Sequence, residues 1–258
     1  MSDYVLEVKK LKKIYGLRTQ NEFEALHNID FQVKLGEFIC IMGPSGSGKS
    51  TFINNISTID MPTSGLVYIN GVEIRTMSSN EIGKFRYQNL GFIFQDFNLL
   101  DTHTLYENIA MPLSLAKVKS KAISKRVQAI AESMNIEHLL SKYPRECSGG
   151  QKQRAAICRA LIGNPKIIIA DEPTGNLDSI NSQELLSILK QLNEEQKVTI
   201  IMVSHDAMIA SYSSRLIYIK DGIIEETLVR GQLSQEEYFQ KIIELNSKEY
   251  QRVLKDKC

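Results

Sequence analysis

The sequence lacks tryptophan and is poor in proline and cysteine, with six prolines and four cysteines in 258 residues. The cysteines do not have the spacing of metal ligands, so we expect them to be reduced and mostly buried; they are Cys40, Cys147, Cys158 and Cys258. The opening residues, 1–7, lack the basic and then apolar pattern of a secretory signal peptide. These absences favour a cytoplasmic protein.

Long hydrophobic runs and a charge excess are also missing. No apolar stretch approaches the roughly 20 residues that a bilayer-spanning helix needs, and runs such as 167–170 have the length of a strand. The 31 Lys and Arg residues nearly balance the 30 Asp and Glu residues, for a net charge of +1. Nucleic-acid binding is therefore not expected, because it needs a basic surface. We expect a soluble chain that reaches a membrane only through a partner.

The hydrophobic fraction of 43% is enough for a substantial core in one or two domains. Short apolar runs bounded by turns predict strands at 5–8, 29–33, 38–42, 67–69, 91–94, 166–171 and 198–204, with a hairpin around 220–222. Helical spacing appears after residue 48, through 104–162, at 179–193 and in the amphipathic tail 234–254. This alternation predicts an α/β fold with a mostly parallel sheet that is covered on both faces.

Residues 43–51 match the P-loop pattern G-x-x-x-x-G-K-[ST], reading Gly43, Pro44, Ser45, Gly46, Ser47, Gly48, Lys49, Ser50 and Thr51. The motif follows an apolar strand and opens a helix, which is the context that a phosphate cradle requires. Its glycines let backbone N–H groups turn toward phosphate oxygens, and the helix N-terminus adds positive potential. We therefore predict ATP and Mg²⁺ binding, with Lys49 on the β- and γ-phosphates and Ser50 as a magnesium ligand.

A second apolar strand ends in two adjacent carboxylates, Asp171 and Glu172. Ligands of open α/β sheets bind at the carboxyl edge of the strands. Asp171 is therefore predicted to hold Mg²⁺, mainly through water, and Glu172 to polarise the attacking water. Two carboxylates after a strand also fit a solvated turn, but the P-loop in the same chain favours the catalytic interpretation.

The segment 147–154, Cys-Ser-Gly-Gly-Gln-Lys-Gln-Arg, resembles the signature of ATP-binding cassette (ABC) ATPases, with Cys147 in place of the usual leucine. The resemblance covers nearly the whole chain, and the motifs follow the order of the family. It implies a P-loop NTPase core with a mostly parallel sheet, an N-terminal antiparallel β-subdomain and an inserted α-helical subdomain. The chain would then be one nucleotide-binding domain, with core and β-subdomain at 1–97 and 164–230, helical subdomain at 98–163, and helical tail at 231–258.

The same resemblance implies further site residues. Tyr15 matches the aromatic residue that stacks on adenine, and Asp178 lies in the loop that contacts the other subunit. Gln95 matches the glutamine that senses Mg²⁺ and couples to the membrane partner, and His205 matches the histidine that contacts the γ-phosphate. The predicted catalytic residues are Lys49, Gln95, Glu172 and His205, and the predicted magnesium ligands are Ser50, Gln95 and Asp171.

The signature is expected to start a helix whose free N–H groups form a second anion site. Because the P-loop already surrounds the phosphates from one side, this second site suggests binding in trans to the nucleotide of another subunit. ATP would then lie at the interface of a homodimer with ATPase activity. The signature residues predicted to bind it are Ser148, Gly149, Gly150 and Gln151.

Residues 171–178 and 92–100 are similar to the macrolide-exporter and lipoprotein-release branch, and the tail 238–243 to bacitracin- and lantibiotic-resistance exporters. This similarity implies an ATPase subunit held at the inner face of the cell membrane by a permease on a separate chain. An apolar docking segment for that permease is expected at Phe97, Leu99 and Leu100. Three alternatives stay open: a lipoprotein-release ATPase, a cell-division ATPase, and a soluble cluster-assembly ATPase without transport.

Overall fold

The computed structural model describes residues 4–255, and for residues 248–255 it describes the backbone only. The strands are β1 (Tyr4–Tyr15), β2 (Phe23–Lys34), β3 (Phe38–Met42), β4 (Ser64–Ile69), β5 (Val72–Glu73), β6 (Leu90–Phe94), β7 (Ile167–Asp171), β8 (Thr199–Val203), β9 (Arg215–Lys220) and β10 (Ile223–Val229). The α-helices are α1 (Lys49–Ile56), α2 (Ser79–Asn89), α3 (Leu105–Leu115), α4 (Ser120–Ser133), α5 (Gly149–Leu161), α6 (Ser179–Gln196), α7 (Ala207–Ala210) and α8 (Gln235–Lys255). Short 3₁₀ turns occupy Ile74–Thr76, Glu137–Leu139 and Pro144–Glu146.

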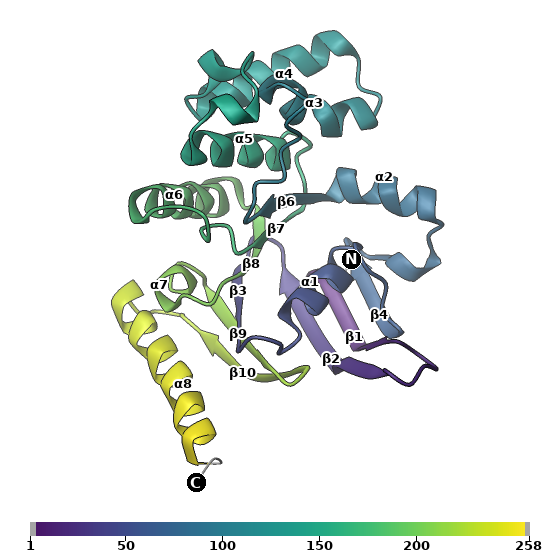
Figure 1. Ribbon diagram of the computed structural model, residues 1–258, viewed down its shortest axis with the longest axis vertical. Coiled ribbons are helices and arrows are strands. Elements are labelled where there is room, and N and C mark those ends of the chain that lie inside the picture. The colour runs from purple at the N-terminus through teal and green to yellow at the C-terminus, as the bar shows by residue number, and fades with distance from the viewer. Residues whose placement is uncertain (1–3, 256–258) are drawn as a thin grey trace.

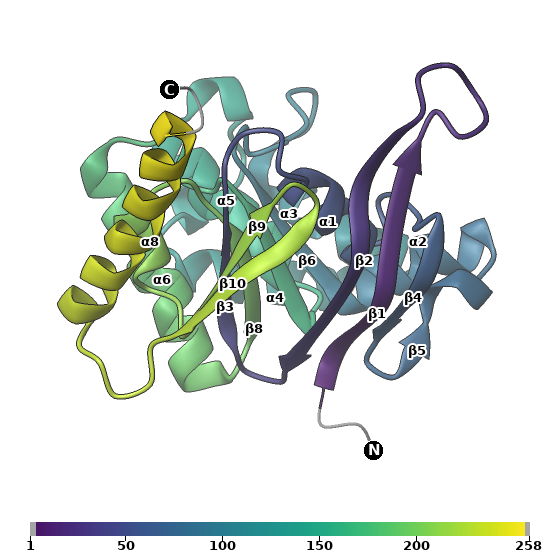
Figure 2. The same cartoon turned by 90° about the horizontal axis from the view of Figure 1, so that it is seen from below.

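Two sheets organise the molecule (Figure 1). One is antiparallel, with strand order β2-β1-β4-β5. The other has the order β10-β9-β3-β8-β7-β6, in which all neighbouring pairs are parallel except β9 with β10. The predicted α/β fold with a mostly parallel sheet and an N-terminal antiparallel sheet is therefore confirmed. Seen from below, the antiparallel sheet stands beside the larger sheet (Figure 2).

The centre of the larger sheet is buried on both faces, and its strand β3 is apolar and buried at every position. In β3, Phe38, Cys40 and Met42 pack into one hydrophobic cluster, which includes side chains of α3, α4, α5, α6 and α8. The alternate residues Ile39 and Ile41 pack into a second cluster with α1 and the antiparallel sheet. The period-2 alternation of a strand thus divides one apolar run between two cores.

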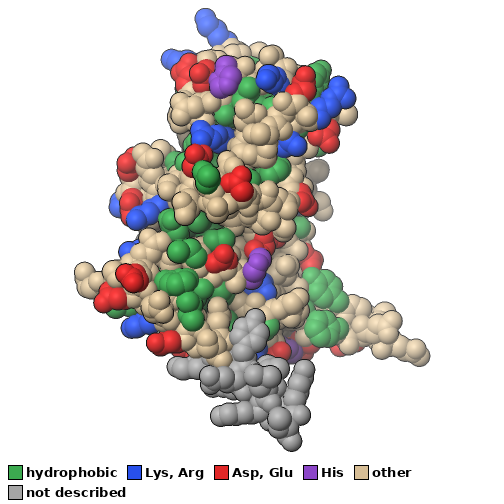
Figure 3. All heavy atoms as spheres, turned by 60° about the vertical axis from the view of Figure 1, so that its left-hand side comes forward, with side chains coloured by type: hydrophobic (Ala, Val, Ile, Leu, Met, Phe, Trp, Pro, Cys, Tyr) green, Lys and Arg blue, Asp and Glu red, His purple; other side chains and the backbone are tan. Residues whose placement is uncertain are grey.

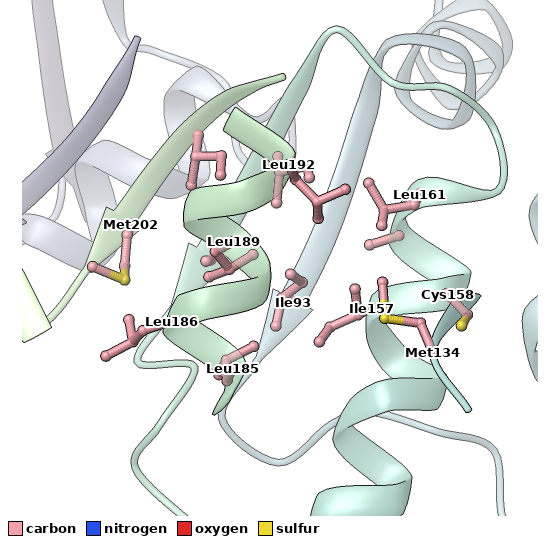
Figure 4. Packing of buried hydrophobic residues seen from close by; sticks show 14 of the residues in the cluster. Ile93, Met134, Ile157, Cys158, Leu161, Leu185, Leu186, Leu189, Leu192 and Met202 are labelled. Carbon is pink, nitrogen blue, oxygen red and sulfur yellow. The ribbon is translucent and has the colours of Figure 1, made fainter. Parts of the chain in front are cut away.

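Helix α6 covers the sheet with a leucine stripe. Leu185, Leu189 and Leu192 recur at helical spacing, and each is less than a tenth exposed. Figure 4 shows these leucines on α6, with Met202 of β8 and Ile93 of β6 on either side of the helix in this view. Packing of this kind, rather than intrinsic helix propensity, supplies most of the stability of such a helix.

Residues 98–163 hold α3, α4 and α5, and Figure 1 shows them together at one end of the molecule. The division of the chain into subdomains stays a prediction. Helix α2 was not foreseen, because it buries only Ile82 and so lacks a periodic apolar face. Its sequence signal is the capping box of Ser78 and Glu81, in which each side chain accepts a hydrogen bond from the backbone N–H of the other residue.

The amphipathic tail is helical, as expected. Tyr238, Ile242 and Leu245 of α8 are buried in the first hydrophobic cluster. The Tyr238 hydroxyl donates to the carbonyl of Leu228 in β10.

Cys40, Cys147 and Cys158 are free and buried, and Cys258 lies outside the described residues. Among the described residues, no helix combines the length and the apolar composition that crossing a membrane requires.

Candidate functional site

The predicted catalytic residues come from four neighbouring parallel strands. Their carboxyl ends are aligned, because Phe94 pairs with Asp171, Asp171 with Val203, and Val203 with Ile41. The chain continues from these ends into the P-loop after β3, Gln95 after β6, Glu172 after β7 and His205 after β8. Parallel pairing therefore brings four sequence-distant segments to one edge of the sheet, where α/β proteins bind their ligands.

The P-loop needs glycine for space and for backbone conformation. Gly43 has φ +149, and a Cβ at this position would lie 1.9 Å from the carbonyl oxygen of Ile219. Gly48 has φ +100, and its Cβ would approach the carbonyl of Ala25 to 2.8 Å. No larger residue fits either position without moving backbone. The loop is thus held tightly between β9 and β2, and α1 starts directly after it.

The side chain of Lys49 folds over its own P-loop, and its Nζ donates to the carbonyls of Gly43 at 2.9 Å and Pro44 at 2.7 Å. Burial lowers the pKa of Lys49, against the opposing charges of Glu172 and Asp171. The pKa of Asp171 is raised by burial and by the neighbouring Glu172, and Lys49 offsets part of this rise. These charges are close enough to influence each other, so a cation beside the two carboxylates would relieve their repulsion.

Glu172 and His205 are joined by a hydrogen bond. His205 Nδ1 lies 2.9 Å and 3.0 Å from the two carboxylate oxygens of Glu172. The side chain of Glu172 is 21% exposed and that of His205 is 77% exposed, so the histidine covers the carboxylate from the solvent side. Glu172 has φ +45, a left-handed conformation that is uncommon for a residue other than glycine and that concentrates at functional sites.

Gln95 lies against a loop that the sequence did not connect to it. A Cβ on Gly175 would come within 2.8 Å of the Gln95 side chain. The Asn176 amide donates to the carbonyl of Gln95 at 3.2 Å and to the carboxylate of Asp96 at 2.7 Å. Asn176 therefore ties the segment after β6 to the segment after β7. The close approach of Gly175 and Gln95 shows why a glycine stands in this loop.

Arg159 of α5 is a second residue whose place the sequence did not reveal. Its guanidinium donates to the carbonyl of Phe97 at 2.7 Å and to the carbonyl of Asn98. Phe97 and Asn98 both have left-handed backbone, with φ +59 and +48. Two consecutive residues in this conformation carry a strain cost, and charge-assisted hydrogen bonds offset it. Arg159 thus fastens the segment after Gln95 to the helix that begins at the signature.

Ser148 is the N-cap of α5, as the sequence predicts. Its hydroxyl accepts from the N–H of Gln151 at 3.3 Å, while the Gln151 side chain accepts from the N–H of Ser148 at 3.0 Å. A Cβ on Gly150 would lie 2.4 Å from Asn181 in α6. Helices α5 and α1 pack in different hydrophobic clusters, on opposite faces of the larger sheet, and Figure 1 shows them apart. One chain therefore does not join the signature to its own P-loop.

Tyr15 ends β1 and is 40% exposed. Asp178 caps α6, accepting from the N–H of Asn181 at 2.8 Å.

The three predicted magnesium ligands, Ser50, Gln95 and Asp171, offer a hydroxyl, an amide and a carboxylate, which are oxygen donors suited to Mg²⁺. Such a set leaves positions for water and phosphate oxygens. The buried hydroxyl of Ser47 has no hydrogen-bond partner among the described residues, so the loop retains one unsatisfied polar atom.

The family of the chain follows from comparisons with known proteins. The family model described as ABC transporter matches residues 26–175. The chain belongs to the ABC transporter ATPases. It is 47% identical over 239 residues to the bacitracin export ATP-binding protein BceA of Halalkalibacterium halodurans, covering 93% of this chain and 94% of that protein. It is 46% identical over 241 residues to YvcR of Bacillus subtilis, an uncharacterised ABC transporter ATP-binding protein, covering 93% of both chains.

A solved structure extends the likeness of this ABC ATPase to three dimensions. The dimeric, post-hydrolysis structure of the ATP-binding cassette MJ0796 of Methanocaldococcus jannaschii, bound to ADP and Pi, matches with a TM-score of 0.79. The two sequences are 39% identical, and the match covers 87% of this chain and 98% of that one. The fold and the ATP-hydrolysing class predicted from the signature and the P-loop are therefore confirmed.

Proposed function

We propose that this ABC ATPase uses Mg²⁺·ATP, held between two copies of the chain, to drive a permease on another chain in resistance to antimicrobial peptides such as bacitracin or lantibiotics. The observation that carries the proposal is the alignment of the P-loop, Gln95, Glu172 and His205 at one sheet edge. Permease binding would place the subunit at the inner face of the cell membrane.

In the proposed chemistry, the P-loop binds the phosphates and Lys49 exchanges its two backbone carbonyls for phosphate oxygens. This exchange is favourable because a charge-assisted contact to an anion is stronger than one to a neutral carbonyl. Ser50, Gln95 and Asp171 hold Mg²⁺, which neutralises charge on the transferring phosphoryl group when bound. Glu172 orients the attacking water, and His205 keeps the carboxylate in place and contacts the γ-phosphate.

The homodimer is supported by the separation of the signature from the P-loop within one chain. Ser148, Gly149, Gly150 and Gln151 then complete the nucleotide site of the partner copy, and Asp178 contacts it. Exposed apolar side chains at the starts of α6 and α7 suit burial in such an interface, because Ile180 is 70% exposed and Met208 is 51% exposed. In Figure 3, hydrophobic side chains gather at mid-height on the visible face, at the level of these helices.

A groove of about 640 Å³ is the proposed docking site for the permease. It lies between α2, β6, α3 and α5, and its apolar lining includes Phe92, Phe94 and Leu115. Leu115 is 60% exposed, so this apolar side chain of the groove is open to a partner. Asn98 and Arg159 also line the groove, so a helix seated there would touch the segment that follows Gln95. Of the three residues expected for docking, Phe97 and Leu99 are half-buried and Leu100 is exposed.

Two likenesses support the peptide-resistance role. One relative is named a bacitracin export protein, and the tail at 238–243 resembles that of bacitracin- and lantibiotic-resistance exporters. A groove between subdomains fits any permease that offers a short helix, so lipoprotein release and cell division remain second candidates.

The experiment measures permease capture and peptide sensitivity together. Leu115→Glu places a charge in the groove, and we expect it to abolish co-purification with the permease and to lower bacitracin resistance in cells. The matched control is Leu35→Glu, on a similarly exposed leucine far from the groove at the turn between β2 and β3. ATP affinity of both isolated variants should equal that of the parent.

Three results contradict the proposal in different ways. Unchanged permease capture by Leu115→Glu rejects this groove as the docking site. A deletion strain with normal peptide sensitivity but blocked lipoprotein release or septation assigns the chain to a sibling branch. A subunit that captures no membrane protein favours the cluster-assembly alternative.

A further inference from the structure

Tyr15 lies a short distance along β1 from the phosphate cradle. A Cβ on Gly48, the last loop glycine, would lie 3.0 Å from the side chain of Leu26. Leu26 is paired across the sheet with Lys13, so the cradle touches β2 at the level of Lys13. Tyr15 is two residues further along, which is about 7 Å at the rise of a strand. That spacing suits the separation of a nucleotide's base from its phosphates.

Two charged side chains hold Tyr15 in place. Its hydroxyl donates to Asp60 Oδ2 at 3.1 Å. Lys13 Nζ donates to Asp60 Oδ1 at 2.7 Å and to the carbonyl of Met61 at 2.8 Å. The same Nζ lies 5.0 Å from the centroid of the Tyr15 ring, within the range of a cation–π contact. The ring is thus fixed at its hydroxyl and covered on one face, while 40% of the residue remains exposed.

The loop that carries Asp60 is the continuation of the P-loop helix. Helix α1 ends at Ile56, and the backbone N–H groups of Ile59 and Asp60 both donate to the carbonyl of Asn54 in its last turn, at 3.0 Å. Asp60 also accepts from the N–H of Met61 at 2.7 Å, which fixes its carboxylate. A single short helix therefore connects the phosphate cradle at its N-terminus to the support of Tyr15 at its C-terminal side.

We propose that Asp60 and Lys13 are positioning residues for the nucleotide base: together they hold the Tyr15 ring as a preformed stacking platform at a fixed distance from the P-loop. The inference deepens the proposed function, because it rests on Tyr15 being the residue on which the base stacks. An exposed tyrosine on a strand end otherwise loses rotamer freedom when a ligand stacks on it, and holding it in advance removes that cost. The cation on the covered face also polarises the ring that meets the base.

The test separates the base from the phosphates by measuring two ligands, ATP and inorganic triphosphate, by calorimetry. Tyr15→Phe keeps the ring and removes its bond to Asp60, and Lys13→Met keeps most of the side-chain volume and removes the ammonium. Each variant should weaken ATP binding about two- to tenfold, the scale of one hydrogen bond or cation–π contact. Triphosphate affinity should stay at the parent value, which also reports that the cradle is folded.

Two further variants make the outcomes distinguishable. Lys9→Met removes a similar contact on the same strand, because Lys9 Nζ lies 5.4 Å from the ring of Tyr68, and it should leave both affinities unchanged. Tyr15→Ala should weaken ATP binding about tenfold or more, as loss of base stacking does.

The positioning role is rejected if Tyr15→Phe and Lys13→Met bind ATP like the parent while Tyr15→Ala binds it weakly. It is also rejected if either variant loses triphosphate and ATP affinity in parallel, since the effect would then lie in the cradle. If Tyr15→Ala itself binds ATP normally, the base platform of the proposed function fails as well.

Discussion

His205 Nδ1 lies 2.9 Å from the nearer carboxylate oxygen of Glu172, so the residues that follow β7 and β8 are linked side chain to side chain. The bond fixes the carboxylate of a residue whose backbone is already held in a left-handed conformation. A carboxylate constrained in both ways loses little freedom when it orients a water molecule, and such preorganisation is what general-base catalysis requires.

Glu172→Gln should preserve ATP affinity and lower turnover by on the order of 10²-fold or more, because an amide cannot accept the proton of the attacking water. Steady-state phosphate release and calorimetry on the purified variant measure the two quantities. Glu226→Gln, on the exposed strand β10, is the matched control and should hydrolyse ATP at the parent rate. Normal turnover by Glu172→Gln would remove this residue from the catalytic role.

Lys49→Ala should weaken ATP binding about tenfold or more, the scale of a lost charged contact to phosphate. The free chain should be little affected, because the carbonyls of Gly43 and Pro44 that Lys49 now contacts can be solvated instead. Calorimetry gives the affinity, and Lys125→Ala on the exposed side of α4 serves as the control. Equal affinity in the Lys49 variant and the parent contradicts the assignment of the cradle.

The Glu172→Gln variant should dimerise with Mg²⁺·ATP and be monomeric without nucleotide, because slow hydrolysis preserves the ATP that joins the two copies. Multi-angle light scattering measures the mass in both conditions. Adding Ser148→Arg should keep the variant monomeric, since it blocks the N-terminus of α5, whereas Ser133→Arg at the end of α4 should not. A mass that does not respond to ATP contradicts the shared site.

Arg159→Met should lower the free energy of unfolding by about 1.5–3 kcal/mol, the range for hydrogen bonds to a charged group. Hydrogen exchange should accelerate at the amides of Phe97 and Asn98, whose left-handed backbone loses its support. Arg145→Met is the control, because Arg145 is exposed beside Tyr143. Unaltered exchange at residues 97–98 would show that the loop holds its shape without the guanidinium.

The Lys13–Asp60 pair predicts a pH dependence. Burial disfavours the ionised form of Asp60, but the hydrogen bond and charge of Lys13 outweigh it, so the pKa of Asp60 in the folded chain lies below its ordinary value. A depressed carboxyl pKa stabilises the fold above the unfolded pKa of about 3.9, and this contribution disappears as pH falls through the lower folded value.

The free energy of unfolding of the parent should therefore decrease more between pH 5 and pH 3 than that of Asp60→Asn, which cannot titrate at this position. Urea titrations at several pH values measure both curves. Parallel curves would mean that the ion pair does not contribute.

Local signals in the sequence were sufficient for the strands of the larger sheet, the P-loop and the start of α5. Each of these depends on a short pattern: an apolar run, glycines before Lys49, or the Ser148-Gly149-Gly150 of the signature. The length of the first strand was underestimated: the sequence predicted residues 5–8, whereas β1 extends over Tyr4–Tyr15. Residues 9–13 contain four lysines and therefore lack the apolar pattern of a buried strand. Pairing on both sides, with β2 and β4, keeps this segment extended.

The supporting residues of the site could not be predicted in the same way. Asn176 and Gln95 are 81 positions apart, and Arg159 and Asn98 are 61 positions apart. Nothing in either local segment indicates these partners, because they meet only when the parallel strands and α5 are assembled. The residues of a motif can be recognised in a single sequence. The residues that hold those motif residues in position become apparent only in the tertiary structure.

The burial of Tyr238, Ile242 and Leu245 also limits how this protein can be recombined with its relatives. Helix α8 is bound to the residue that follows α7, because Gln235 donates to Ser211 at 3.0 Å, and to β10 through the hydroxyl of Tyr238. A chimera with a junction near residue 230 would combine two halves of one hydrophobic core that had diverged separately. The tail is exchangeable only together with the surface of α7 and β10 that receives it, so these segments should vary as a group among homologues.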